Sequence, residues 1–241
     1  MATNTSSAVW YGRFLLFIAG MGGLLYGIDV GIIAAALLYL EKTINLTVGE
    51  TSIIVAAVLG GSMFSSLVAG ILADWFGRKT MLVVSGLMFV ASVGLIVISQ
   101  AFLPLFLGRL LQGMSGGVIA VVVPLYLAEC LSAKTRGQGT AIFQFMLTFG
   151  IVVAALVGLF YTQRAESAIT AAAGNAELIK AAQNHAWRGM FLSVIYPGLI
   201  FFLGLCGERI APLVIPPRKK GPGFGGAPQI MLGGGGRIRN P

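Results

Sequence analysis

Six long apolar runs, each about 20 residues, restrict the fold of this chain more than any other feature. They cover residues 14–38, 52–73, 80–99, 103–126, 139–160 and 190–206. Hydrophobic residues make up 57% of the 241 residues and charged residues only 10%, a balance that excludes an ordinary soluble domain. Because the runs are continuous rather than alternating, they favour membrane helices over a β-barrel. We therefore expect an all-α membrane protein with six transmembrane helices in the lipid bilayer.

The excess of basic residues, 16 Lys and Arg against eight Asp and Glu, is expected to lie in the loops. In a membrane protein such an excess sets the orientation of the helices, so we expect no nucleic-acid partner. If both termini share one side, that side carries nine basic residues and the other side four. The nine are Arg13, Arg78, Lys79, Lys134, Arg136, Arg209, Arg218, Lys219 and Lys220, and the four are Lys42, Arg164, Lys180 and Arg188. This asymmetry predicts cytoplasmic termini in a cell membrane, plasma or inner.

Two charged residues, Asp29 and Arg109, lie inside the apolar runs. An arginine at membrane depth costs about 2.5 to 3.5 kcal/mol unless a buried partner receives it. Asp29 is the only acid within the six runs, and both residues lie roughly 10 Å from the same membrane surface at 1.5 Å per residue. We therefore expect them to pair. A purely structural ion pair remains an alternative, although apolar residues would stabilise the contact at least as well.

The stretch after the fourth run, PLYLAECLSAKTRG, combines a proline, an aromatic residue, an acid and a terminal Arg-Gly. It resembles the P-x-Y-x-x-E…R-G signature of the sugar porter family of the major facilitator superfamily. The matching residues are Pro124, Tyr126, Glu129, Arg136 and Gly137. The family usually has proline where this chain has Ser132. The first run, GGLLYGIDVGIIAAA, is also similar to the first helix of that family around Asp29.

The segment GILADWFGRKT, after the second run, resembles the G-x-L-x-D-x-x-G-R-[RK] signature of the superfamily. An acid at the end of one helix and two bases at the start of the next can pair in one conformation and separate in another. The resemblance therefore implies a cytoplasmic gate formed by Asp74, Arg78, Lys79, Glu129 and Arg136. Positive-inside anchoring by Arg78 and Lys79 alone is the simpler alternative.

Gln144 is the large amide of the fifth run. It matches, with Thr148 and Gly150, the Q-x-x-x-[TI]-x-G pattern of the family, in which the glutamine contacts sugar. The resemblance implies that Gln144 binds substrate, because an amide can both donate to and accept from a hydroxyl. An interhelical hydrogen bond is an almost equally good interpretation.

The resemblance covers residues 22–206 and implies the N-terminal six-helix half of the twelve-helix major facilitator fold. The implied activity is proton-linked symport of a monosaccharide or polyol, with Asp29 and Arg109 coupling protons and a further half completing the site. A six-helix membrane protein that does not transport, as a remnant or an assembly partner, and a half-size transporter that self-associates are the alternatives. The sequence contains no nucleophile beside a base and no cluster of metal ligands, so we expect neither an enzyme nor a cofactor.

The remaining segments flank the 14–206 membrane domain or interrupt it. Residues 1–13 are interpreted as a short lead, and residues 161–186 as an external loop with a short surface helix, where His185 is assigned no role. Residues 207–241 are rich in Gly and Pro and predict a disordered tail. Translation of this tail one nucleotide later permits a sequence that looks like the P-E-S-P-R-W-L signature of the family, so we interpret the tail as frameshifted and the chain as truncated.

Overall fold

The computed structural model describes residues 5–131 and 135–210, and every regular element in them is a helix. The helices are α1 (Thr5–Ile44), α2 (Val48–Phe76), α3 (Arg78–Ile98), α4 (Phe102–Cys130), α5 (Arg136–Ala171), α6 (Ala176–Ser193) and α7 (Ile195–Ile210). Six spans in this part of the chain are long and apolar enough to cross a membrane, because α6 and α7 together form one of them. The predicted all-α class is confirmed.

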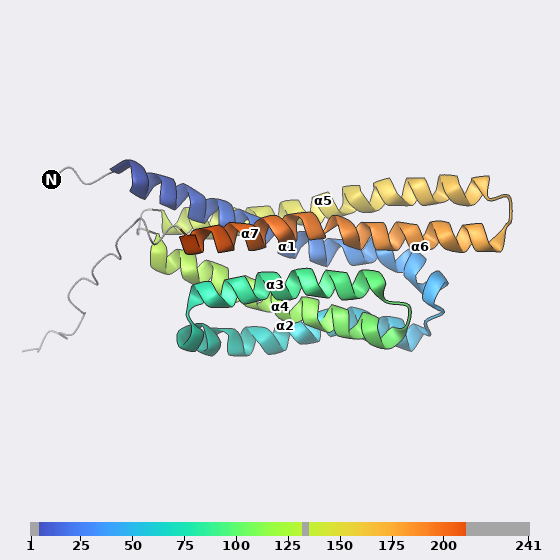
Figure 1. Cartoon of the computed structure of the whole chain (residues 1–241), viewed down its shortest axis with the longest axis horizontal. Helices are drawn as coiled ribbons and strands as arrows, with labels where there is room; N and C mark the ends of the chain where they lie inside the picture. Colours follow the sequence, from blue (N-terminus) through green and yellow to red (C-terminus); the bar gives the residue numbers. More distant parts are fainter. Residues whose placement is uncertain (1–4, 132–134, 211–241) are drawn as a thin grey trace, which may run out of the picture.

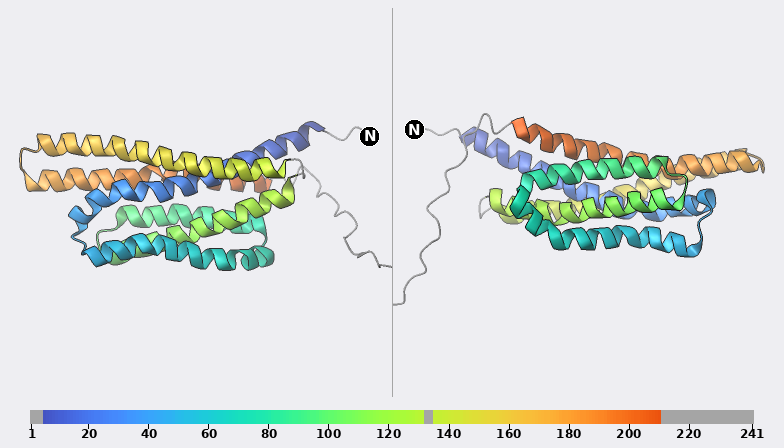
Figure 2. Two further views of the ribbon diagram at one scale, coloured as in Figure 1. Left: turned by 180° about the vertical axis from the view of Figure 1, so that it is seen from behind. Right: turned by 60° about the horizontal axis from the view of Figure 1, so that its bottom comes forward.

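The helices run back and forth along one axis (Figure 1). The N-terminal end of α1, the junction of α2 with α3 and the last turn of α7 lie at one end of the bundle, and the tip between α5 and α6 lies at the other. α1 packs mainly against α5, whereas α4 packs against α2 and α3. Figure 2 shows the same two groups of helices from behind and from below.

Close contact between α1 and α5 depends on glycines spaced four residues apart in α1. A Cβ atom on Gly23 or Gly27 would overlap a main-chain carbonyl oxygen of α5, and one on Gly31 would lie 2.6 Å from Cβ of Ala154. α4 uses Gly113 and Gly117 in the same way against α2. Small residues at such spacing allow helix backbones to approach each other within a membrane.

The interruption between α6 and α7 has a local cause in Pro197. Proline has no N–H, so it cannot donate to the carbonyl of Ser193, which lies four residues earlier. The structure ends α6 at Ser193 and begins α7 at Ile195, and Gly198 N donates to Val194 O over 3.3 Å. Pro197 itself lies in the first turn of α7, where a missing donor costs little.

The expected external loop over residues 161–186 is instead almost entirely helical. α5 continues to Ala171 and α6 begins at Ala176, so the two helices form a hairpin that projects beyond the other helices (Figure 1). Alanine has the highest helix propensity, and the Asn175 side chain accepts hydrogen bonds from the first N–H groups of α6. Gly174, with φ of 87°, allows the turn between the two helices.

The predicted tail lies mostly outside the described residues. Its first four residues, 207–210, belong to α7, and residues 211–241 are not described. Ser132 and the first four residues of the predicted lead also lie outside the described part of the chain.

Candidate functional site

The two charges of the apolar runs meet in the interior of the bundle. Asp29 of α1 and Arg109 of α4 are 1% and 2% exposed, and Nη1 of the arginine lies 3.5 Å from Oδ1 of the aspartate. The predicted contact between these side chains is thus present. Both groups are removed from lipid, as the energetic cost of a charge in hydrocarbon requires.

Arg109 has two further partners that hold its guanidinium group. Its Nη1 donates to Oε1 of Gln112 over 2.8 Å, and its Cζ lies 5.3 Å from the ring centroid of Phe191 in α6. Gln112 is fully buried. Residues three apart on a helix face the same side, so the amide lies one turn from the arginine on α4. The site therefore joins α1, α4 and α6.

Sequence reasoning missed Gln112 and Phe191. The signal for Gln112 was present, because an amide three residues after a membrane arginine on one helix can reach it. No comparable signal pointed to Phe191, since an apolar residue in an apolar run is uninformative. Its position over Arg109 depends on how α6 packs in three dimensions.

Several polar atoms of this cluster are buried without a hydrogen bond to any described residue. They are both carboxylate oxygens of Asp29, Nε of Arg109 and Nε2 of Gln112. The contact between Asp29 and Arg109 is therefore electrostatic attraction without a hydrogen bond. The desolvation of this carboxylate is therefore compensated by the nearby guanidinium charge and by no hydrogen bond from a described residue.

Two of the other four predicted gate residues converge on Arg78, the first residue of α3. Its Nη2 lies 2.6 Å from Oδ1 of Asp74 in α2 and 2.9 Å from Oε1 of Glu129 in α4. One guanidinium group thus joins the ends of three helices. Lys79 follows it in α3, and Arg136 is exposed at the start of α5 and forms no ion pair with a described residue.

Gln144 lies on the exposed side of α5. Its side chain makes no hydrogen bond within residues 5–131 and 135–210, although its carbonyl accepts one from the Thr148 hydroxyl over 3.2 Å. The interhelical hydrogen bond considered as an alternative is thus not found among the described residues. No hydrogen bond among the described residues links the Gln144 side chain to the buried pair.

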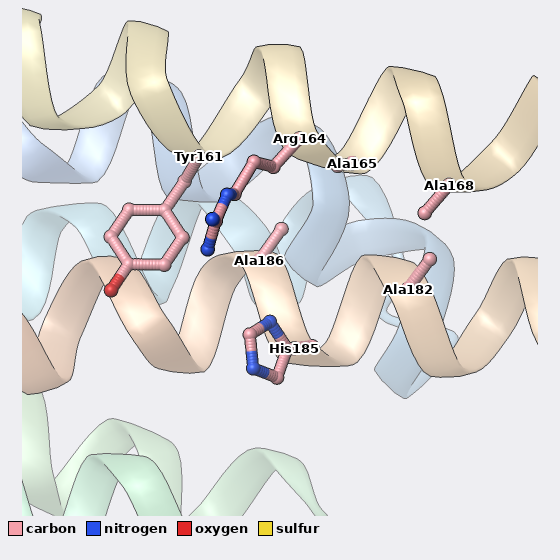
Figure 3. Close-up of a pocket in the computed structure, with 7 residues that line it drawn as sticks. All are labelled: Tyr161, Arg164, Ala165, Ala168, Ala182, His185 and Ala186. Carbon is pink, nitrogen blue, oxygen red and sulfur yellow. The ribbon is translucent and has the colours of Figure 1, made fainter.

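A cavity of about 150 Å³ lies elsewhere, between α5 and α6 in the projecting hairpin. In Figure 3, Tyr161 and Arg164 come from α5, and His185 comes from α6. Four alanines complete the lining, and Arg164 itself lies 5.0 Å from the ring centroid of Phe160. The described residues contain no group of three His, Cys, Asp or Glu side chains that could hold a metal ion.

Six membrane-length helices around a buried carboxylate and guanidinium pair define a multi-pass membrane protein. The fold is similar to about half of the proton:xylose symporter XylE, a major facilitator superfamily protein, with a TM-score of 0.68 at 23% identity, over 83% of this chain and 45% of that one. The inward-open xylose transporter XylE from E. coli matches with a TM-score of 0.65 at 24% identity, over 82% of this chain and 48% of that one.

The sequence profile of the family described as "Sugar (and other) transporter" matches residues 15–208. The chain is 30% identical to a D-xylose transporter from Levilactobacillus brevis, over 79% of this chain and 38% of the relative. It is 29% identical to the galactose-proton symporter of Escherichia coli K12, over 80% of this chain and 37% of the relative. The chain belongs to the Sugar (and other) transporter family, and it spans less than half the length of these relatives.

Proposed function

We propose that this chain provides the N-terminal half of a proton-linked sugar or polyol transporter in a cell membrane. The observation that carries the proposal is the buried contact between Asp29 and Arg109, in a chain whose relatives include a galactose-proton symporter. An ionisable pair in the membrane interior is costly and is a functional site by default. The relatives are named as transporters, which also favours transport over an enzymatic activity.

In the proposed mechanism, a proton binds to the Asp29 carboxylate. The neutral carboxylic acid no longer attracts the Arg109 guanidinium as an ion, so the link between α1 and α4 weakens. The helices that meet at this site can then shift, and the transporter changes the side to which it opens. Loss of the proton restores the pair. Symport differs from facilitated diffusion in requiring this step.

Gln144 is proposed to contact the substrate. Its exposed amide can donate a hydrogen bond to one sugar hydroxyl and accept one from another. The amide makes no hydrogen bond to a described residue that would compete with the sugar. The remaining contacts would come from a second six-helix half facing it, because transporters of this kind bind substrate between two repeats. The identity of the sugar or polyol depends on that second half.

The cluster around Arg78 is proposed to bias opening at one membrane surface. Arg78 contacts Asp74 from α2 and Glu129 from α4 at the same time, so separation of these helix ends must break at least one of the contacts. We further propose, from the distribution of basic residues, that this end of the bundle is cytoplasmic. Lys79 and Arg136 add positive charge at the same end.

A direct test is uptake of labelled hexoses, pentoses and polyols into liposomes with an inward proton gradient. We expect no uptake by the chain alone, and saturable uptake by a chimera that joins it to the C-terminal six helices of the E. coli galactose-proton symporter. In that chimera, Asp29→Asn should abolish uphill accumulation while exchange continues. Accumulation that is unchanged by this substitution would refute proton coupling through Asp29.

Saturable uptake by the chain alone would instead show that it is a half-size transporter. Two copies could rebuild a cavity, because the two halves of this fold are related by an axis along the membrane normal. Cross-linking of the reconstituted chain would then be expected to show a dimer. Empty liposomes, and liposomes without a proton gradient, are the controls.

A further inference from the structure

One nitrogen of Arg109 lies between two oxygen atoms from different helices. Its Nη1 is 2.8 Å from Oε1 of Gln112 and 3.5 Å from Oδ1 of Asp29. Only the shorter distance falls in the usual range of an N–H···O hydrogen bond. The carboxylate oxygens of Asp29 accept no hydrogen bond from any described residue. Arg109 is therefore hydrogen-bonded to its own helix and only electrostatically attracted to α1.

We propose that Gln112 is a positioning residue that keeps Arg109 on α4 when Asp29 is protonated. The inference deepens the proposed function and rests on it. If Asp29 loses its charge, Arg109 still has an amide acceptor one turn away and the face of Phe191 beside it. A desolvated guanidinium group without an acceptor would be far less stable, because hydrogen bonds to charged groups are strong. Protonation would thus release α1, while Arg109 remains in place.

The burial of the amide supports this role. Gln112 is fully buried, and an uncharged amide in the apolar interior requires a hydrogen-bonding partner. Its Oε1 atom uses Arg109 as that partner, whereas its Nε2 atom has none among the described residues. If the role of Gln112 were packing alone, an apolar side chain of similar length would fill the same space and leave no amide donor unpaired. The amide oxygen is thus the part of the side chain that the site requires.

The test is a set of substitutions in the purified chain, measured by unfolding in mixed micelles and independent of transport. Asn at position 29 stands in for the protonated aspartate. Gln112→Met keeps the length of the side chain and removes the acceptor, whereas Gln112→Glu keeps an acceptor. We expect Gln112→Met to lower the folding equilibrium constant about tenfold more in the Asp29→Asn background than in the wild type. Equal losses in the two backgrounds would overturn the proposal.

The order of the two substitutions separates positioning from packing. In the Asp29→Asn background, Gln112→Glu should be more stable than Gln112→Met, because a carboxylate can replace the lost partner of Arg109. A packing role predicts the opposite order, since Met suits an apolar site better than Glu. If Asp29→Asn alone fails to give a monodisperse protein, recovery of the monodisperse peak by Gln112→Glu supports the proposal, and no recovery contradicts it.

Gln183→Met is the matched control. This buried glutamine lies on α6, eight residues before Phe191 and so about 12 Å along the helix from it. The changes in unfolding free energy caused by Gln183→Met and by Asp29→Asn should therefore add in the double variant. These measurements need no substrate, so their failure would refute the role of Gln112 without refuting the proposed transport function. Failure of the uptake experiments would refute the transport function and leave the stability result unchanged.

Discussion

Arg78 and Glu129 are 51 residues apart in the sequence, yet Nε and Nη2 of the arginine lie 3.0 and 2.9 Å from the same carboxylate oxygen. Oδ1 of Asp74 contacts the same Nη2 atom at 2.6 Å. The arginine side chain is 28% exposed and those of Asp74 and Glu129 are 65% and 44% exposed, so water screens these contacts. Their value lies in joining three helix ends rather than in large individual energies.

We expect Arg78→Ala to lower the stability of the purified chain by about 1 kcal/mol, and the loss to shrink in high salt. Arg136→Ala is the control. The sequence predicts Arg136 as part of the same gate, but this residue forms no ion pair with a described residue. The midpoint of unfolding in mixed micelles at low and high salt measures both. Equal losses for the two variants would contradict the central position of Arg78.

Arg188 is expected to stabilise the opposite end of α3. Its Nη2 donates to the carbonyl of Ser99, the residue that follows α3, over 3.1 Å, and its Cζ lies 5.1 Å from the ring centroid of Trp187. A cation at the C-terminal end of a helix also interacts favourably with the helix dipole. Arg188→Met should therefore cost about 1 to 2 kcal/mol. Lys180→Met, at an exposed position of α6, should change the unfolding midpoint little.

Replacement of glycine by alanine is expected to have different effects at Gly27, which packs against α5, and at Gly60, which borders open space. Gly27→Ala places a methyl group against the main chain at Leu147, and we expect a loss of about 1 to 3 kcal/mol or more. At Gly60 of α2 a Cβ atom would meet nothing within 4 Å, so Gly60→Ala should be neutral or stabilising. Thermal stability in detergent distinguishes the two. Equal tolerance at both positions would show that α1 and α5 are less closely packed.

The proposed orientation can be tested by labelling cysteines with a membrane-impermeant maleimide. Cys130 is exposed at the end of α4, and Cys206 lies near the end of α7, at the end of the bundle proposed to be cytoplasmic. In intact cells we expect neither to react until the membrane is permeabilised. Ala173→Cys, in the turn of the α5 and α6 hairpin, should react without permeabilisation in a chain whose native cysteines are replaced by serine. The reverse pattern would invert the proposed orientation.

The number of membrane helices and the pairing of Asp29 with Arg109 could be predicted from the sequence, because both follow from the cost of placing polar groups in hydrocarbon. Helix ends were less predictable. An apolar run marks only the part of a helix that lies in the hydrocarbon of the membrane. The helices extend beyond the runs, since α1 continues to Ile44 and α5 to Ala171. The alanine-rich residues 161–186 were expected as a loop because they are not apolar enough to mark a membrane span. They form helices because alanine has a high intrinsic helix propensity.

The surroundings of the charged pair could be predicted only in part. The proximity of Gln112 to Arg109 follows from helical spacing, but the cation–π contact with Phe191 depends on how α6 packs against α1, α3 and α5. The sequence also did not separate Arg78 from Arg136, since both follow helix ends and both match family signatures. Only the three-dimensional arrangement shows that Arg78 reaches two acids.

Gly77 is the single residue between the last residue of α2 and the first of α3, and its φ is 85°. Two helices joined by one residue cannot slide far along each other. A change in the angle between α2 and α3 must therefore occur mainly through φ and ψ of Gly77. A methyl group at Gly77 would meet no neighbouring atom within 4 Å, but the backbone conformation itself excludes most other residues. The angle between α2 and α3 therefore depends on the two torsions of one glycine, at a position where any other residue would be strained.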